Sequence, residues 1–211
     1  MKNYFLLLTL LCLSLSARAH DAEVDGIFYN LNAANKTATV TFKGYFSATY
    51  NNEYSGDVVI PETVTYNGIT YSVTSLADGC FQYCSSLTAI TIPNSVKSLE
   101  KWCFRDCSSL TAIYMLPSTP PSTGYGIFEN TPLETVYVVD EDAKTAYQAQ
   151  APWNEYEIVV MPTGIEEVGT DKTAPTIVGY YGLNGKLING KQRGVVIVRY
   201  SDGTTRKVLV K

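Results

Sequence analysis

The chain has 211 residues, of which 16 are basic and 20 acidic, so its formal net charge is −4. An acidic surface repels the phosphates of nucleic acids, and we therefore expect no nucleic-acid partner. The single histidine, His20, lies near the N-terminus, so a Ser-His-Asp or Cys-His site has no plausible base. With no phosphate-binding glycine motif and no H-E-x-x-H motif either, we predict a protein that is not an enzyme and has no cofactor.

Residues 1–19 have the three parts of a secretory signal peptide. Lys2 supplies the positive start, Phe5–Leu15 the apolar stretch, and Ala17-Arg18-Ala19 the small residues of a cleavage site. Cleavage would remove two basic residues and no acidic residue, which leaves 192 residues from His20 onward with a net charge of −6. No later segment has the roughly 20 apolar residues that span a bilayer. We expect an exported protein, located at the cell surface, outside the cell or in the periplasm.

Residues 20–56 are predicted to form an N-terminal β cap. Gly26–Leu31 and Thr37–Phe42 alternate apolar and polar side chains as two strands do, and Asn32–Lys36 would form the turn. A stack of repeats leaves an apolar surface open at its end, and this hairpin would cover it.

A repeat dominates residues 57–161. Cys80–Ile90 reappears 23 residues later as Cys103–Ile113, with only two residues changed. A third, degenerate copy keeps apolar residues at Phe128, Leu133 and Val136. A fixed period of this length is typical of a solenoid, in which each unit buries its apolar side against the next.

Each copy follows the pattern Phe-x5-Leu-x2-Ile-x-Ile, whose last part has the two-residue period of a strand. We predict parallel strands at Leu87–Ile92, Leu110–Met115 and Leu133–Val138. The preceding segments Ser75–Tyr83 and Ser98–Asp106 are predicted to form a turn plus a short helix on the opposite side, with the Phe in the core.

A fourth unit lies upstream, because Val58–Val64 matches Ile90–Val96. It is followed by an insertion, Tyr66–Tyr71, with Asn67-Gly68 at its centre. An Asn-Gly pair between alternating aromatic and aliphatic residues predicts a tight β-hairpin.

Over about residues 55–140, the run Ile-Pro-x-x-Val, Thr-Ser-Leu and Cys-Phe-x-x-Cys-Ser-Ser-Leu-Thr-x-Ile-x-Ile-Pro resembles the BspA-like family of bacterial leucine-rich repeats. That pattern usually has Ala where Cys80 and Cys103 stand. The resemblance implies a secreted or surface-exposed solenoid, and some relatives bind host matrix proteins or other cells. We therefore expect an α/β repeat solenoid: a short right-handed leucine-rich-repeat stack with parallel strands, an N-terminal β-hairpin cap and a small C-terminal all-β module.

Four cysteines lie in the repeats, at Cys80, Cys84, Cys103 and Cys107. Their spacing could suggest a four-thiolate zinc site, but the repeat explains it without a metal, because equivalent positions of adjacent units stack. Buried free thiols are the favoured interpretation. One or two disulfides between repeats, Cys80 with Cys103 and Cys84 with Cys107, are the alternative in an exported protein.

The end of the repeats has its own signals. Asp140-Glu141-Asp142 precedes a predicted short helix at Ala143–Gln150, and carboxylates at a helix start cap free N–H groups. Because no calcium-loop spacing follows, we interpret these acids as a cap. Trp153 and Ile158–Val160 would close the stack.

Residues 162–175 have the composition of a linker, and residues 176–211 form a predicted β module. Its strands are expected at Ile177–Tyr181, Lys186–Ile188, Val195–Tyr200 and Lys207–Val210. This tail resembles the C-terminal sorting signals of type IX secretion, although it is shorter. A sorting signal and a plain structural β module both remain open.

The candidate binding site lies on the strands. If Leu87, Ile90 and Ile92 point inward, the residues between them are expected to face solvent. The first column would be Val59, Thr91, Tyr114 and Tyr137, and the second Ala89, Ala112 and Thr135. Such a flat, aromatic and uncharged surface is typical of interaction sites. The alternative is that the tyrosines only pair across strands and stabilise the sheet.

These features predict an exported, non-enzymatic protein that binds a protein or glycan at the cell surface through the two columns. A surface built from so few repeats would suit weak or multivalent contacts, including weak self-association. The alternative function is a structural envelope or spacer protein whose strands contact copies of itself.

Overall fold

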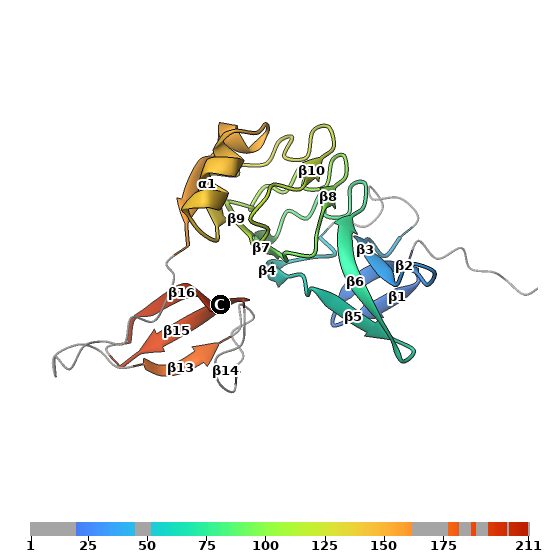
Figure 1. Ribbon diagram of the computed structural model, residues 1–211, viewed down its shortest axis with the longest axis horizontal. Helices are drawn as coiled ribbons and strands as arrows, with labels where there is room; N and C mark the ends of the chain where they lie inside the picture. Colours follow the sequence, from blue (N-terminus) through green and yellow to red (C-terminus); the bar gives the residue numbers. More distant parts are fainter. Residues whose placement is uncertain are drawn as a thin grey trace, which may run out of the picture.

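The computed structural model describes residues 20–44, 52–161, 177–181, 187–188, 194–201 and 203–210. The predicted signal peptide 1–19 and linker 162–175 lie outside these residues. The described residues form mostly strands, and they include one α-helix, α1 (Glu141–Gln148), and one 3-10 helix, η2 (Trp153–Glu155) (Figure 1). Within this part of the chain, no helix has the length and apolarity needed to cross a bilayer.

The strands form three sheets. The first contains β1 (Ala22–Val24), β2 (Ile27–Asn32), β3 (Thr37–Thr41), β6 (Ile69–Leu76), β8 (Ser98–Leu99) and β10 (Ser122–Thr123), with β5 (Thr63–Tyr66) paired to β6. The second contains, in spatial order, β12 (Glu157–Val160), β11 (Thr135–Val138), β9 (Ala112–Met115), β7 (Leu87–Ile92) and β4 (Gly56–Val59). The third contains β14 (Leu187–Ile188), β13 (Ile177–Tyr181), β15 (Gly194–Tyr200) and β16 (Thr205–Val210).

The repeats place one strand in each of the first two sheets. From β6 to β11 the chain alternates between these sheets, and all pairs in the second sheet are parallel. The predicted parallel strands are therefore present, with β9 and β11 starting two residues later than expected. β12 adds a further parallel strand beside β11, so Ile158–Val160 extends the sheet as well as ending it.

The predicted helices in Ser75–Tyr83 and Ser98–Asp106 are wrong. These segments contain the end of β6, or β8, followed by turns. The reason lies in the backbone hydrogen bonds: the N–H of Phe81 donates to the carbonyl of Cys103 at 2.9 Å, and that of Phe104 to Ile127 at 2.9 Å. Because these donors bond to the next repeat, they do not form the bonds to residue i−4 that an α-helix requires. The fold is thus a β-rich repeat structure rather than an α/β one.

The chain forms two antiparallel hairpins, β2–β3 before the repeats and β5–β6 within the first of them. β2 and β3 pair antiparallel from Phe28 opposite Thr41 to Asn32 opposite Thr37. β5 and β6 pair around Asn67-Gly68, whose φ values of 49° and 78° match the two positive angles of a type I′ turn. The Asn-Gly hairpin predicted from the sequence is present. That β2 and β3 act as a cap remains a prediction.

Aromatic rings form a continuous column through the core. Consecutive centroids lie 4.5–6.1 Å apart along Phe28, Tyr54, Phe81, Phe104, Phe128 and Trp153. Each repeat contributes its Phe, so the repeat period in the sequence becomes a stack of rings in the fold. Packed aromatic pairs contribute about 0.5–1.5 kcal/mol each beyond the area they bury.

Helix α1 covers the end of the repeats. The Asp140 side chain accepts a hydrogen bond from the Ala143 N–H at 2.8 Å, which makes it the N-cap. The helix buries Tyr147, whose ring lies 5.2 Å from the buried Trp153 ring, and its hydroxyl donates to the Pro117 carbonyl at 3.1 Å. The acidic run thus supplies a cap, and Trp153 lies where the aromatic column ends.

The C-terminal strands form a separate antiparallel sheet. β15 pairs with both β13 and β16, and β14 pairs with β13. The strands overlap the expected segments, with β14 beginning one residue later, β15 one residue earlier and β16 two residues earlier than expected. In Figure 1 this sheet lies beside the repeat region, below the ribbon of α1 and close to β4.

Candidate binding surface on the strand face

The candidate site is the outer side of the second sheet, which we call the strand face: Val59, Thr91, Tyr114, Tyr137, Ala89, Ala112 and Thr135. The strand pairing puts Val59 opposite Thr91, Thr91 opposite Tyr114, and Tyr114 opposite Tyr137. The second column is equally in register, with Ala89 opposite Ala112 and Ala112 opposite Thr135. The structure therefore brings all seven residues together in two neighbouring columns.

Their exposure differs from the expectation. Thr91 is 1 % exposed, Ala89 4 % and Tyr114 6 %, whereas Val59 is 43 % exposed. Tyr137, Ala112 and Thr135 are half-buried. The prediction that the centre of the strand face is open to solvent is therefore wrong for Thr91, Ala89 and Tyr114.

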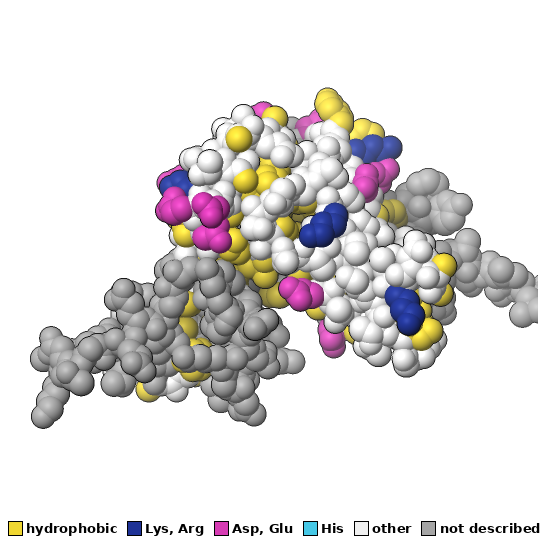
Figure 2. Space-filling model, in the orientation of Figure 1, with side chains coloured by type: hydrophobic (Ala, Val, Ile, Leu, Met, Phe, Trp, Pro, Cys, Tyr) yellow, Lys and Arg dark blue, Asp and Glu magenta, His cyan; other side chains and the backbone are white. Residues whose placement is uncertain are grey.

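The cover comes from the C-terminal sheet. Val195 of β15 and Met161 form an apolar cluster with Ala89 and Tyr114, and Ile197 packs at its margin. This cluster is separate from the main core, which holds Phe81 and Phe104. Figure 2 shows hydrophobic side chains gathered where the repeat region meets the C-terminal module. Period-two alternation identifies which side chains point away from the main core, but it carries no signal about a distant strand that covers them.

The centre of the strand face is aromatic and its ends are acidic. The Tyr114 and Tyr137 rings are stacked, with centroids 4.8 Å apart and planes at 10°. The second column continues to Asp57 beside Ala89 and to Glu157 beside Thr135. The Asp57 carboxylate accepts a hydrogen bond from the Thr88 hydroxyl at 2.8 Å. The surface thus has an apolar middle between two carboxylates.

Thr91 is the fully buried polar residue of the strand face. Its Oγ1 atom is buried and has no hydrogen-bond partner among the described residues. A buried hydroxyl without a partner costs about 1–3 kcal/mol. The strand face therefore makes apolar contacts with Val195 at Ala89 and Tyr114 and holds a buried hydroxyl at Thr91 that is unpaired within the described part of the chain.

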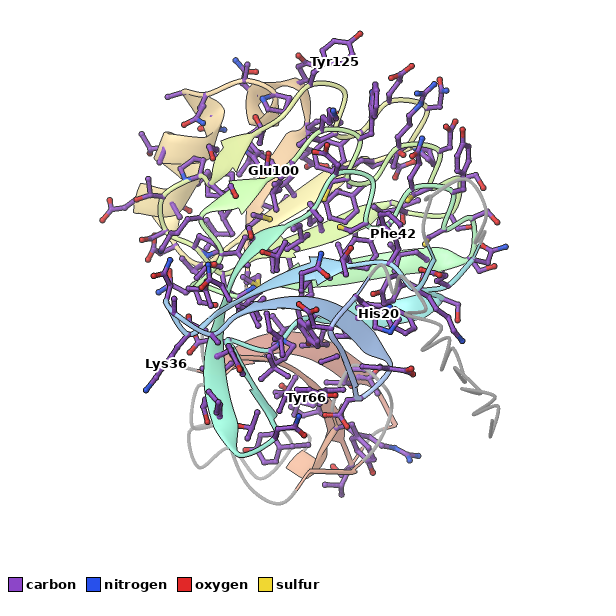
Figure 3. The ribbon with its side chains drawn as sticks, turned by 90° about the vertical axis from the view of Figure 1, so that its right-hand side faces the viewer. His20, Lys36, Phe42, Tyr66, Glu100 and Tyr125 are labelled. Carbon is purple, nitrogen blue, oxygen red and sulfur yellow. The ribbon has the colours of Figure 1, made fainter. Side chains whose placement is uncertain are left out.

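The other surface feature is the loop Leu116–Gly126, which is irregular apart from β10. Its Tyr125 is 78 % exposed and projects from the edge of the repeat region in Figure 3. Tyr125 lies apart from the strand face in the strand order, because its neighbour β10 belongs to the first sheet.

The four cysteines are all buried. Burial raises the pKa of the Cys84 thiol to about 11 and also raises the pKa of Cys80 and Cys107. Cys107 donates a hydrogen bond to the Phe81 carbonyl at 3.0 Å, and Thr131 donates in the same way to the Phe104 carbonyl. Cys107 and Thr131 thus make equivalent hydrogen bonds to the backbone of the preceding repeat, a role that was not predicted from the sequence. Within the described residues, no group of three or more His, Cys, Asp or Glu side chains is placed to hold a metal ion.

Comparison with known proteins identifies the repeat. Residues 63–150 match the family model described as the BspA type leucine rich repeat region (6 copies). The comparison with curated proteins returned no match.

Several solved structures are similar. A leucine-rich repeat protein from Bacteroides ovatus is 24 % identical over 68 % of this chain and 42 % of its own, with a TM-score of 0.44. A leucine rich cell surface protein from Faecalibacterium prausnitzii is 24 % identical over 61 % of this chain and 34 % of its own, with a TM-score of 0.41. A leucine-rich repeat protein from Bacteroides capillosus is 23 % identical over 56 % of this chain and 98 % of its own, with a TM-score of 0.39. This chain spans less than half the length of the first two. The match of residues 63–150 to a leucine-rich-repeat model agrees with the parallel sheets and few helices among the described residues.

Proposed function

We propose that this chain is an exported cell-surface protein that binds a protein partner through the strand face. The observation that carries the proposal is the contact made by the aromatic centre of this surface. Tyr114 packs against Val195, and Ile197 lies at the margin of the same cluster. Both belong to a separate β-sheet. A surface that accommodates the apolar side chains of one β-strand has the shape and chemistry to accommodate those of a partner.

The C-terminal sheet is a replaceable cover in this proposal. Next to Tyr114 in the strand register, the Thr91 hydroxyl is buried without a partner among the described residues. A bound segment with a polar group at this point would recover part of the roughly 1–3 kcal/mol lost there. A partner must compete with the C-terminal sheet for the strand face. It competes best if an apolar group contacts Tyr114 and a polar group contacts Thr91.

The charges at the two ends of the strand face further restrict the chemistry of the partner surface. Asp57 on β4 and Glu157 on β12 lie on the outer strands of a five-stranded sheet. Four strand spacings of about 4.8 Å separate these strands by about 19 Å. A protein surface with an apolar centre and basic residues at both ends would complement this arrangement.

The test uses the mature chain in three forms: wild type, Val195→Asp with Ile197→Asp, and that double variant with Tyr114→Ala and Tyr137→Ala added. The two Asp substitutions put charge into the apolar cluster and are expected to release the C-terminal sheet. Each form is applied to an array of purified extracellular matrix proteins and to a glycan array. Circular dichroism checks that the repeat region stays folded.

We expect the released form to bind at least one matrix protein more tightly than the wild type does, and the removal of both tyrosines to abolish the gain. Binding that survives the loss of the tyrosines would contradict the strand face as the site. Binding on the glycan array alone would replace the protein partner by a carbohydrate. Concentration-dependent mass in light scattering, without array binding, would support the structural, self-associating alternative.

A further inference from the structure

Two of the four cysteines face each other across neighbouring repeats. The Sγ atoms of Cys80 and Cys103 are 3.2 Å apart, and the two residues are 2 % and 0 % exposed. A disulfide bond is about 2.05 Å long, so closure requires a movement of about 1 Å. We infer that Cys80 and Cys103 form a disulfide between repeats in the exported chain, and that Cys84 and Cys107 stay as buried thiols.

The backbone hydrogen bonds beside this pair set a chain spacing that suits a disulfide. On either side of Cys80, the N–H of Gly79 donates to the Lys101 carbonyl at 3.0 Å and the N–H of Phe81 to the Cys103 carbonyl at 2.9 Å. Hydrogen-bonded neighbouring chains lie about 4.7–4.9 Å apart. That spacing falls within the range of about 4.4–6.8 Å between the Cα atoms of bridged cysteines. The bridge therefore needs side-chain adjustment rather than a change of fold.

Cys107 is arranged differently from Cys103, whose thiol lies 3.2 Å from the Cys80 sulfur and only a longer 3.6 Å from the Ala77 carbonyl. The Cys107 thiol donates to the Phe81 carbonyl at 3.0 Å, so its hydrogen points to the backbone. Thr131, one repeat further along, bonds to the Phe104 carbonyl in the same way. A hydroxyl group thus replaces the thiol at an equivalent position, which indicates a hydrogen-bonding role for Cys107 rather than a bridging one.

The chemistry is a two-step thiol–disulfide exchange with a small-molecule or enzyme disulfide, R–S–S–R, as the oxidant. The thiolate of one cysteine attacks this disulfide and releases one R–S⁻, which takes up a proton. The thiolate of the other cysteine then attacks the mixed disulfide, forms the Cys80–Cys103 bond and releases the second R–S⁻. In total, two thiol protons and two electrons pass to the oxidant, which becomes two R–SH.

The burial of both residues sets the time at which the reaction takes place. An oxidant cannot reach side chains that are 2 % and 0 % exposed in the folded chain. Burial also raises the pKa of Cys80, which leaves little thiolate at neutral pH. The bridge therefore forms while the repeats are folding, and once formed it resists reductants that act on the native protein.

The inference needs an oxidising environment, as export in the proposed function supplies, but it does not depend on partner binding. The test refolds the mature chain from urea in a mixture of reduced and oxidised glutathione, which makes the result independent of export. Thiols are counted after denaturation, and non-reduced peptides are mapped by mass spectrometry. We expect two free thiols and one linked pair of peptides, which contain Cys80 and Cys103.

Two double variants serve as a matched pair, since each removes two buried sulfur atoms. Cys84→Ala with Cys107→Ala is expected to keep the bridge, and reduction under denaturing conditions should lower its melting temperature by about 5–10 °C. Cys80→Ala with Cys103→Ala is expected to keep two free thiols and show no shift on reduction. Four free thiols in the refolded wild type, or a linkage of Cys84 with Cys107, would overturn the inference.

Discussion

Tyr114 and Tyr137 stack across strands β9 and β11, with ring centroids 4.8 Å apart and ring planes at 10°. The two residues are direct partners in the strand register. Tyr114 is 6 % exposed because the cluster around Val195 covers it. The pair therefore belongs at once to the repeat sheet and to its contact with the C-terminal sheet.

Replacing Tyr114 by Ala is expected to loosen the C-terminal sheet. The change removes a buried ring from both contacts and should lower the free energy of unfolding by about 3 kcal/mol. The measurement is amide hydrogen exchange of β15, which should become faster. Tyr125→Ala is the matched control, because that ring is 78 % exposed and its loss should change stability by less than about 0.5 kcal/mol. Unchanged exchange in β15 would show that Tyr114 does not hold the sheet.

Thr91→Val is expected to stabilise the protein. The substitution removes a buried hydroxyl that has no partner among the described residues, so the free energy of unfolding should rise by about 1 kcal/mol. Thr88→Val is the control, because the exposed Thr88 hydroxyl donates to Asp57 and its loss should be neutral or slightly destabilising. Urea denaturation measures both. A loss of stability in Thr91→Val would mean that the hydroxyl makes a stabilising contact.

Phe104→Ala is expected to destabilise the repeats strongly. Phe104 is 0 % exposed and stacks on Phe81 at 5.3 Å and on Phe128 at 5.6 Å. The cavity left in the aromatic column should cost about 3–5 kcal/mol of unfolding free energy in urea denaturation. Ile69→Ala, at a position 41 % exposed in the hairpin, should cost less than about 1 kcal/mol. Similar losses for the two variants would argue against the column as the main core.

Asp140→Ala is expected to cost about 1 kcal/mol, because it removes the hydrogen bond that caps α1. Asp142→Ala removes a carboxylate from the same turn without removing the cap, and should cost only a few tenths of a kcal/mol. Thermal unfolding of the two variants compares the effects. Equal losses would mean that charge near the helix start matters, rather than the cap.

Stability is expected to fall at alkaline pH. Burial raises the pKa of Cys84 from 9.0 to about 11, so the unfolded chain loses this proton at lower pH than the folded chain. The favourable contribution is complete below about pH 9 and is lost as the pH rises through about 11. Cys84→Ala lacks this titration, so its free energy of unfolding should fall less steeply over the same interval. Parallel pH profiles of the variant and the wild type would contradict the prediction.

The strand register could be predicted from the sequence because the repeat is nearly exact. Cys80–Ile90 and Cys103–Ile113 have the same apolar spacing, so equivalent residues had to stack if the units stacked at all. The first column of the strand face, from Val59 to Tyr137, follows from that spacing. The aromatic column through Phe81 and Phe104 follows from it as well.

Local sequence patterns gave wrong helix predictions where backbone N–H groups form hydrogen bonds to residues far along the chain. The segments before β7 and β9 were expected to be helical, yet their N–H groups bond to carbonyls of the next repeat. Such bonds depend on a neighbour that lies 22 or 23 residues away in the chain, and no local propensity reports it. The equivalent hydrogen bonds of Cys107 and Thr131 were not predicted for the same reason.

Period and spacing in the chain were thus enough to establish the repeats, their parallel strands and which side chains leave the core. They could not establish what those side chains meet. Tyr114 is buried because Val195 of β15, far along the chain, packs against it, and Cys80 contacts Cys103 because two turns stack with their sulfur atoms aligned. Exposure and side-chain contact depend on which surfaces meet in three dimensions, and only the packed fold decides that.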